Sequence, residues 1–246
     1  MDLVRSFLDA TKYSRDRLPE ARCGVTRVPP YKRYDETLPR ITLPRPESLP
    51  KVSFWETVAR RRSLRRYTQA EIPGVQLCLL LWATQGITRP GNVALRSSPS
   101  AGALFPIETY VAVNRVADLE PGLYHWELPD ERLVLLRRDE NLGESVASAC
   151  LDQSMCRDAA CNFLWTAVFE RTLWKYGDRG LRYVYLDAGH MGHALQMAAT
   201  ALGLGSCNIG ALFDDEVNRL LGVDGTQESI VYAASVGAAE GPLGAM

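Results

Sequence analysis

The chain has 246 residues, 46% of them hydrophobic, and a formal net charge of -1 at pH 7. That length and apolar content suffice for a sizeable core, whereas the near-neutral charge argues against a general nucleic-acid or membrane-surface binder. No apolar run approaches the roughly 18 residues of a membrane-spanning helix, and the acidic N-terminal segment is unlike a secretory signal or transit peptide. A cytoplasmic protein is therefore expected.

Residues 1–50 are rich in proline and charge and predict an extended arm. Each proline removes a backbone donor and restricts the residue before it, so no long helix is expected here. The side chains of Tyr31, Tyr34, Ile41 and Leu43 give this arm apolar groups with which to dock. A disordered tail is the alternative. Residues 51–246 are expected to form one domain.

A short helix is predicted to start at Ser53, which forms a capping box with Glu56. The segment RRRSLRRY follows at 60–67, with five arginines in eight positions. Cations at a helix C-terminus contribute only about 0.3 to 1 kcal/mol each, which leaves most of the cluster unexplained. A solvated basic face remains one explanation. The other is a phosphate site, because arginines beside Ser63 at a turn can form bidentate, charge-assisted hydrogen bonds.

The rest of the chain alternates helices and strands without a regular βαβ repeat, which predicts an α+β class. The segment 87–106 is rich in glycine, proline and serine and is expected to be a functional loop. The expected elements are a buried helix at 72–86 ending at Gly86, a strand at 108–114, a hairpin of 122–128 with 132–138, a helix at 141–151, a strand at 161–171, a long central helix at 178–205, a short strand or loop at 206–213, a helix at 214–223 and a final strand at 229–237.

Several familiar sites are absent or poorly supported. The six cysteines form no C-x-x-C pair and are expected to be reduced, mostly buried residues. His190 and His193 lie near Asp187 on the central helix, but no further ligand has a recognisable spacing, so no metal site is expected. The sequence has no Walker A motif or nucleophile elbow, and GLGSCNIG lies in the wrong context for a dinucleotide-binding loop.

Three segments together resemble the nitroreductase superfamily of flavoproteins. RRRSLRRY is similar to the R-x-S-x-R-x-[FY] segment that opens that domain. SSPSAGALFPIETYV (97–111) and YLDAGHMGHALQMAATALGLGSCNIGALFDDEVNRLLGVDG (185–225) resemble the loop, long helix and final segment of its SagB-type dehydrogenase branch. The likeness covers roughly residues 30–237. It implies a nitroreductase-like fold, with a central, mainly antiparallel sheet flanked by helices, in an intertwined homodimer that holds FMN at the subunit interface.

The FMN contacts that the resemblance implies fall into three groups. The phosphate and ribityl chain would be held by Arg61, Arg62 and Ser63, with Arg65 near the N1 and O2 edge of the flavin, where a cation stabilises reduced flavin. The other subunit would supply a loop of small residues that packs on the ring and ribityl chain: Pro99, Ser100, Ala101 and Gly102. The backbone of Ile209, Gly210 and Ala211 would face N5 and O4.

One departure from the superfamily concerns its late Lys-x-Arg pair at the phosphate site. The sequence after Gly237, AAEGPLGAM, has no basic residue. More of the phosphate charge is therefore expected from the 60–67 segment, with Arg89 or Arg96 as helpers. Arg60 and Arg66 are given no role.

A Lys-Tyr pair matches a pair that the SagB-type branch links to azoline oxidation. Lys175 and Tyr176 lie in RTLWKYGDRGLRY (171–183). When flavin removes a hydride from one ring carbon, a base must take a proton from its neighbour. A neutral lysine or a tyrosinate, favoured by desolvation or by a cation such as Arg179 or Arg182, could be that base. A structural role, with Lys175 solvated and Tyr176 packed, remains open.

The resemblance therefore implies an FMN-dependent oxidoreductase of the SagB type, with azoline-to-azole dehydrogenation of a modified peptide as its reaction and a cyclodehydratase as a candidate partner. The alternative is a nitroreductase or quinone reductase that takes electrons from NAD(P)H and acts on small molecules. A third alternative is a non-catalytic flavin-binding partner in a synthetase assembly. No nucleic-acid or membrane partner is expected.

Overall fold

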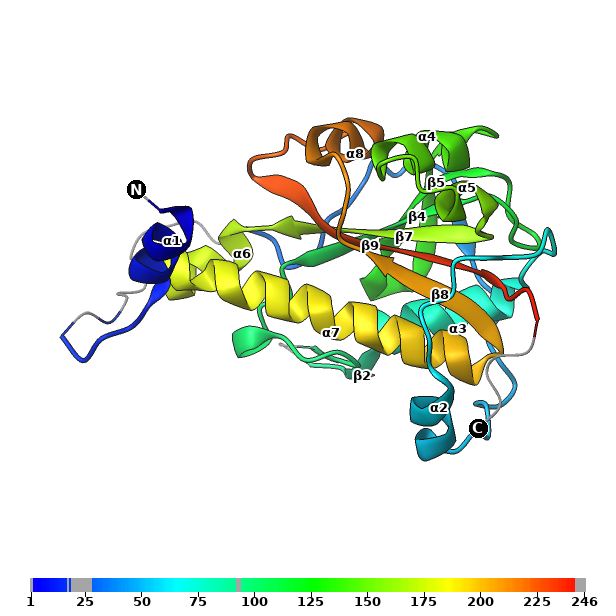
Figure 1. Cartoon of the computed structure of the whole chain (residues 1–246), viewed down its shortest axis with the longest axis horizontal. Coiled ribbons are helices and arrows are strands. Elements are labelled where there is room, and N and C mark those ends of the chain that lie inside the picture. The colour runs from blue at the N-terminus through cyan, green and yellow to red at the C-terminus, as the bar shows by residue number, and fades with distance from the viewer. Residues whose placement is uncertain (1, 17, 19–27, 92–93, 242–246) are drawn as a thin grey trace.

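The computed structural model describes residues 2–16, 18, 28–91 and 94–241, and these form a helix-flanked β-sheet (Figure 1). Seven strands lie in the order β1-β6-β5-β4-β7-β9-β8, and each neighbouring pair is antiparallel. The strands are β1 (Arg40–Thr42), β4 (Ile107–Val113), β5 (Gly122–Glu127), β6 (Arg132–Arg138), β7 (Cys161–Val168), β8 (Leu204–Ile209) and β9 (Glu228–Ala238). The predicted α+β class with an antiparallel sheet is confirmed.

Helices cover both faces of this sheet (Figure 1). On one face, α3 (Gly74–Gln85) and α7 (Gly180–Ala201) pack against β4 residues such as Val111 and Val113. On the other face, α4 (Leu142–Ala149), α5 (Met155–Asp158) and α8 (Asp214–Leu221) pack with Tyr110 and Ala112 of the same strand. Because successive strand residues point to opposite faces, β4 serves two cores and is buried throughout.

The long helix predicted at the centre of the domain is α7. Its buried stripe recurs at helical spacing, from Val184 through Met191 to Ala199. At Gly192 an added Cβ would lie 2.6 Å from the Tyr232 ring and 2.8 Å from the Asn208 amide nitrogen, so glycine lets the helix approach β8 and β9 closely. The opposite face of α7 is open, with Tyr185 and Leu186 more than half exposed.

Local predictions were confirmed for most elements and wrong for a few. Helix α3 ends at Gly86, and the 3-10 turn η2 (Leu128–Asp130) closes the predicted hairpin. Helix α2 (Phe54–Arg60) follows Ser53, but the Ser53 side chain makes no capping hydrogen bond. The expected loop at 87–106 contains a hairpin of β2 (Ile87–Arg89) with β3 (Leu95–Arg96) and the 3-10 turn η1 (Ala101–Ala103). The loop prediction missed this hairpin because its strands have only two or three residues.

The first 50 residues are not extended throughout. Helix α1 (Leu3–Thr11) lies beside the start of α7, where Arg182 Nε donates to Thr11 Oγ1 at 2.7 Å. Strand β1 joins the edge of the sheet by pairing with β6. Residues 40–42 of this segment therefore belong to the sheet, while the separation of an arm (1–50) from an FMN-binding domain (51–246) remains a proposal.

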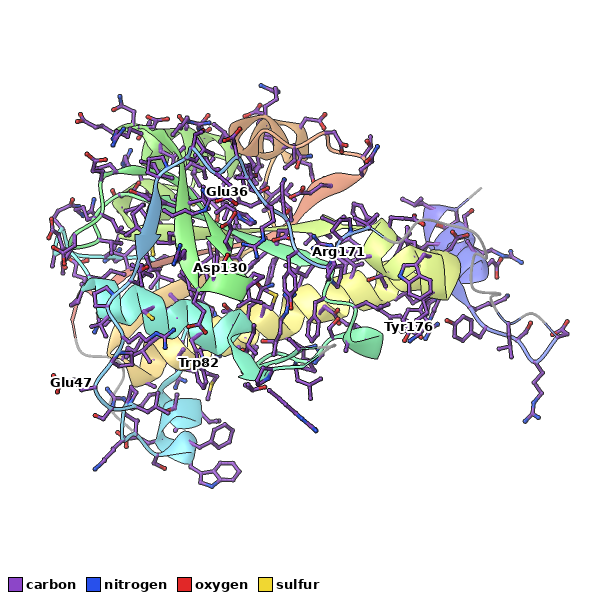
Figure 2. The ribbon with its side chains drawn as sticks, turned by 180° about the vertical axis from the view of Figure 1, so that it is seen from behind. Glu36, Glu47, Trp82, Asp130, Arg171 and Tyr176 are labelled. Atoms are coloured by element: carbon purple, nitrogen blue, oxygen red, sulfur yellow. The ribbon has the colours of Figure 1, made fainter. Side chains whose placement is uncertain are left out.

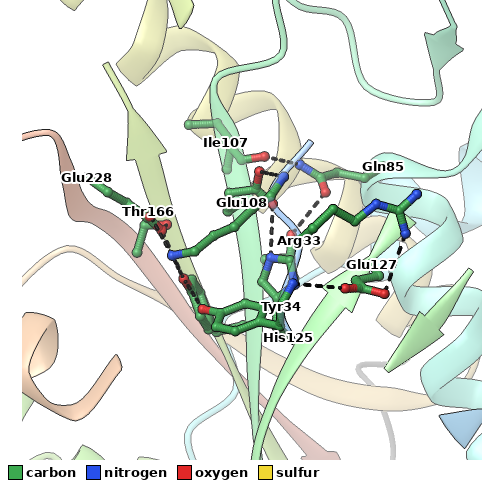
Figure 3. A network of polar contacts seen from close by, with 12 residues as sticks. Arg33, Tyr34, Gln85, Ile107, Glu108, His125, Glu127, Thr166 and Glu228 are labelled. Carbon is green, nitrogen blue, oxygen red and sulfur yellow. Dashed lines mark hydrogen bonds and ion pairs between the residues drawn. The ribbon is translucent and has the colours of Figure 1, made fainter. Parts of the chain in front are cut away.

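A buried polar network fastens this segment to the sheet (Figure 3). Lys32 Nζ lies 2.6 Å from Glu228 Oε2, and the Lys32 backbone N–H donates to Glu108 Oε1 at 3.0 Å. Arg40 forms an ion pair with Glu127, whose side chain is fully buried. Charged residues of this segment, Lys32 and Arg40, therefore attach it to the sheet and are not simply solvated.

Candidate functional site

The arginine segment leaves α2 and runs onto the edge of the sheet. Ser63 forms an isolated parallel bridge with Ser206 of β8, and the Leu64 N–H donates to the Ser206 carbonyl at 2.9 Å. Tyr67 fixes the far end of the segment, because its buried hydroxyl lies 2.8 Å from Ser235 Oγ and its ring packs against Gly237. An added Cβ at Gly237 would lie 2.9 Å from that ring, so the close fit requires glycine.

Most guanidinium groups of this segment lack carboxylate partners. Arg60 is the exception, with an ion pair to Glu56 at 3.0 Å. Arg61 instead donates to Gln196 Oε1 of α7 at 3.4 Å, and Arg62 donates to the backbone carbonyls of Ala59 and Arg61. Within the part of the chain that the structure describes, none of Arg61, Arg62, Arg65 and Arg66 forms an ion pair with a carboxylate. The segment therefore presents uncompensated positive charge.

Strand β8 connects this charge to the predicted Ile209–Ala211 backbone. Ile209 lies three residues beyond Ser206, or about 10 Å along the strand. Gly210 and Ala211 follow the strand and are exposed. Burial raises the pKa of Cys207, between these points, while the Arg65 charge and a hydrogen bond from Ser63 oppose that rise. A basic cluster and an exposed backbone segment thus lie along one edge strand.

The Pro99–Gly102 loop is fixed by an aspartate of α7. Asp187 accepts hydrogen bonds from Ser100 Oγ at 2.5 Å and from the Ala101 N–H at 3.3 Å. Burial raises the pKa of Asp187, although both hydrogen bonds oppose the rise. Gly102 has φ +62°, in the region that favours glycine, and begins a turn that continues with positive φ at Ala103. This carboxylate thus holds the small-residue loop against the helix.

Lys175 and Tyr176 contact the same loop. They end helix α6 (Glu170–Tyr176), which the 3-10 turn η3 (Gly177–Arg179) joins to α7. An added Cβ at Gly102 would lie 2.5 Å from Tyr176 Oη and 2.8 Å from Lys175 Nζ. The Tyr176 ring packs edge-on against Tyr183 at 4.9 Å between centroids. Both side chains are half-buried, and in Figure 2 Tyr176 lies toward the end of the molecule that carries α1.

The structure therefore forms two groups from the predicted residues. One contains the arginine segment and the end of β8, and the other contains Pro99–Gly102 with Lys175 and Tyr176. Along α7, Gln196 of the first group lies nine residues, or about 13 Å, from Asp187 of the second. Within one chain the two groups are therefore separated along this helix.

Two contact residues were missed from the sequence. Gln196 joins Arg61 to Ser63, since its Nε2 donates to Ser63 Oγ at 3.4 Å, and Asp187 was considered only as a metal ligand. Both are buried polar residues on the apolar side of α7. A polar residue at such a position needs a hydrogen-bonding partner, and this was the available signal.

Other candidate sites gain little from the structure. No group of three or more metal-ligating side chains occurs among the described residues, and His190 and His193 are exposed on α7. Five cysteines are free and four of these are buried, whereas Cys23 lies outside the described residues. None of the described helices is both long and apolar enough to cross a membrane.

Comparison with known families identifies the fold. The sequence profile described as "Nitroreductase family" matches residues 58–238. A protein named as a nitroreductase from Methanocaldococcus jannaschii is 34% identical over 170 residues, which cover 69% of this chain and 84% of that protein. The chain therefore belongs to the nitroreductase family, and this membership makes it an oxidoreductase.

A second relative is named as a trifolitoxin-processing protein, TfxB, from Rhizobium leguminosarum bv. trifolii. It is 30% identical over 147 residues, which cover 58% of this chain and 39% of that protein. This chain therefore corresponds to less than half of TfxB.

Three solved structures are similar to the whole fold. A structure titled as a nitroreductase from Anabaena variabilis has a TM-score of 0.70 and 31% identity, covering 83% of this chain and 42% of that one. A chain of the Escherichia coli microcin synthetase McbBCD complex has a TM-score of 0.64 and 20% identity, covering 97% of this chain and 92% of that one. A structure titled as a nitroreductase in complex with FMN from Desulfovibrio desulfuricans has a TM-score of 0.56 and 20% identity, covering 80% of this chain and 91% of that one. The last two similarities show the fold alone.

Proposed function

We propose that this chain is an FMN-dependent oxidoreductase of the SagB type that dehydrogenates azoline rings of a modified peptide to azoles. The observation that carries the proposal is the contact of Lys175 and Tyr176 with Gly102, which brings candidate bases to the loop predicted to pack on the flavin. FMN, when bound, supplies the acceptor for a hydride.

The arginine segment fits the phosphate of this cofactor. Arg61, Arg62 and Ser63 would hold the phosphate and ribityl chain, and Arg65 would face the ring edge. Uncompensated guanidinium groups suit a dianionic ligand, because each can form charge-assisted hydrogen bonds with phosphate oxygens. Ile209, Gly210 and Ala211 follow Ser206 along β8 and beyond its end, and in this proposal their backbone would face the ring system.

The second group of residues would act at the ring from the other subunit of a homodimer. Pro99–Gly102 would pack on the flavin, and the Asp187 carboxylate would keep that loop in place. Lys175 or Tyr176 would take the proton from the azoline carbon next to the carbon that loses hydride. A second chain would complete the site, as the resemblance to the nitroreductase superfamily implies.

The modified-peptide substrate is supported by two similarities. TfxB is named as a toxin-processing protein, and the McbBCD structure is titled as a synthetase with truncated pro-MccB17 bound. These suggest that this chain also works on a peptide, beside a cyclodehydratase that forms the azoline. A non-catalytic flavin-binding partner in such an assembly remains the alternative of another class.

A reductase that takes electrons from NAD(P)H is the second candidate. The family name and the M. jannaschii relative favour it, since both are named for nitroreductase activity. In both candidate reactions the enzyme would alternate between an oxidised and a reduced form. The two functions are therefore distinguished by which substrates the enzyme converts. An NADPH-driven reductase reduces nitro compounds or quinones and leaves azoline peptides unchanged.

The test combines flavin content, turnover and one pair of variants. The purified protein should be yellow, should release FMN on denaturation and should oxidise a thiazoline peptide. Lys175→Ala should retain flavin but turn over at least about tenfold more slowly, equal to roughly 1.4 kcal/mol. Lys51→Ala, at an exposed lysine of the same charge, is the control. Unchanged turnover in Lys175→Ala would exclude the base role, and a colourless protein without FMN would exclude the flavin-dependent function.

A further inference from the structure

A pocket of about 290 Å³ lies against the turn of Ala103, Leu104 and Phe105, which directly follows Gly102. Its walls come from three segments of the described chain: residues 28–31 of the arm, residues between 94 and 105, and α6. It shares the turn and α6 with the Lys175–Tyr176 pair. The volume lies near the lower end of the range for small-molecule sites, which suits a single amino-acid residue or a chain terminus.

The pocket is cationic and has no acidic side chain among its described lining residues. These residues are apolar, aromatic or basic, and the two basic ones are Arg96 and Arg171. Arg171 is 4% exposed and already paired, since its Nη1 lies 2.6 Å from Glu108 Oε1 and its Nε donates to the Pro29 carbonyl at 2.7 Å. Glu108 Oε2 also lies 3.0 Å from His125 Nε2, so both carboxylate oxygens of Glu108 already have partners.

Of the two basic residues that line this pocket, Arg96 is the one without an ion pair among the described residues. Its guanidinium lies over two rings, 4.3 Å from the Phe105 centroid and 5.3 Å from the Tyr31 centroid. Its Nε is buried without a hydrogen-bond partner, and no carboxylate of the described residues forms an ion pair with it. Burial lowers the pKa of Arg96 to about 10, although the nearby Glu108 charge and a hydrogen bond with Tyr31 oppose the fall.

We propose that this pocket binds a carboxylate group of the peptide substrate, with the Arg96 guanidinium as its partner. The inference rests on the proposed peptide-modifying function and names a recognition element for it. A planar guanidinium in contact with two aromatic rings is oriented in advance, and a carboxylate can accept two parallel hydrogen bonds from it. The apolar walls would receive the side chain that accompanies the carboxylate. Arg96 therefore contributes to substrate selection here and not to the FMN phosphate site.

The test compares peptides that differ in one charge. Acetyl-Gly-Gly-Leu free acid and its carboxamide are titrated into the whole protein by calorimetry, with FMN in excess to occupy the arginine segment. The acid should bind at least about tenfold more tightly than the amide. Acetyl-Gly-Gly-Glu carboxamide, whose side chain carries the carboxylate, distinguishes an internal acidic residue from a chain terminus as the natural ligand group.

Variants then locate the preference. Arg96→Gln should bind the acid and the amide equally. Arg45 is an exposed arginine that follows β1 and does not line this pocket, so Arg45→Gln should keep the tenfold ratio. If Arg96→Gln does not fold, Leu104→Trp fills the pocket and should remove the preference while Arg96 remains. Equal binding of all three peptides to the unmodified protein, or an unchanged ratio in both pocket variants, would overturn the proposal. These titrations measure binding and do not need turnover. An inactive or flavin-free protein would therefore refute the proposed function, whereas the carboxylate preference of the pocket would still be decided by the titrations.

Discussion

The arginines of 60–67 differ in their contacts although they are adjacent in sequence. Arg60 is paired with Glu56 within α2, which gives it a local role on the surface. Arg61 reaches across to Gln196 of α7 and thereby approaches Ser63. Arg66 is exposed, and its backbone carbonyl accepts from the Glu240 N–H. Arg61, which contacts α7, is therefore the candidate phosphate ligand, whereas Arg66 is an exposed surface charge.

The pair Arg61→Ala and Arg66→Ala tests this separation. Loss of about two charge-assisted hydrogen bonds should weaken FMN binding by about 3 kcal/mol, on the order of a hundredfold. Arg61→Ala should therefore purify colourless, and Arg66→Ala should stay yellow with the same fold. The measurement is FMN released per chain, with circular dichroism of both variants. Equal flavin content would mean that Arg61 does not hold the phosphate.

At the residue scale, the sequence could predict the groups that lie close together along the chain. The arginine segment and the small-residue loop were recognisable because each is a short motif. Asp187 and Gln196 could not be assigned, because their partners Ser100 and Arg61 lie 87 and 135 residues away. A buried polar residue on a helix predicts that a partner exists, but the fold decides which one.

At the scale of elements, Glu108 of β4 joins the arm, the sheet and α6. It accepts from the Lys32 N–H, lies 3.0 Å from His125 Nε2 and pairs with Arg171. Burial opposes ionisation, but the His125 hydrogen bond and the Arg171 charge lower the pKa of Glu108 to about 2. Figure 3 shows this carboxylate within the polar network between the arm and the strands.

The substitution Glu108→Gln should weaken folding in a pH-dependent way. Folding lowers the pKa of Glu108 from an ordinary 4.5 to about 2, so its charge stabilises the folded state above pH 4.5, and this contribution is lost as pH falls toward 2. The variant should lose about 3 kcal/mol near neutral pH, where Arg171 is left unpaired. The difference from the unmodified protein should shrink by pH 3.

Urea unfolding at pH 7 and pH 3 measures both effects. Glu36→Gln is the matched control, because the Glu36 side chain is 86% exposed and lies 3.6 Å from Arg40. It should unfold like the unmodified protein at both pH values. A loss in Glu108→Gln that is the same at pH 3 as at pH 7 would mean that packing, and not charge, explains the effect.

Most elements could be predicted because their patterns are long. The stripe of α7 and the β5–β6 hairpin are clear in the sequence alone. Strand β1 was missed, since three residues beside prolines resemble a loop and its partner β6 begins 90 residues later. Helix α1 was missed although its apolar residues recur at helical spacing, because the proline-rich remainder dominated the prediction for 1–50.

At the scale of the molecule, apolar side chains remain uncovered on α2 and α7. Phe54 and Trp55 of α2 are 63% and 76% exposed, and Tyr185 and Leu186 of α7 are 56% and 58% exposed. Large exposed apolar groups on neighbouring helices are typical of an interface. They support the proposed homodimer, which would also bring the two residue groups of the site together.

The dimer proposal predicts a mass of twice 27.3 kDa in sedimentation equilibrium. Leu186→Glu would place a charge in the proposed interface and should shift the protein to monomer at micromolar concentration, with loss of bound FMN. Leu151→Glu is the control, because that exposed leucine follows α4 on the other side of the sheet. A Leu186→Glu dimer that keeps its flavin would place the interface elsewhere.

The stretch from Arg40 to Tyr67 has a further consequence for solubility. Strand β1 covers one edge of the sheet, and the Ser63–Ser206 bridge lies along the opposite edge strand, β8. Uncovered edge strands present free backbone donors and acceptors to other chains, and this starts edge-to-edge aggregation. One continuous segment thus supplies the edge strand β1 at one end of the seven-stranded sheet and a backbone contact to β8 at the other. If this segment detached, β6 would become an uncovered edge and β8 would lose its contact with Ser63. The residues proposed to bind the cofactor therefore belong to a part of the chain that also limits pairing of the sheet with a neighbouring molecule.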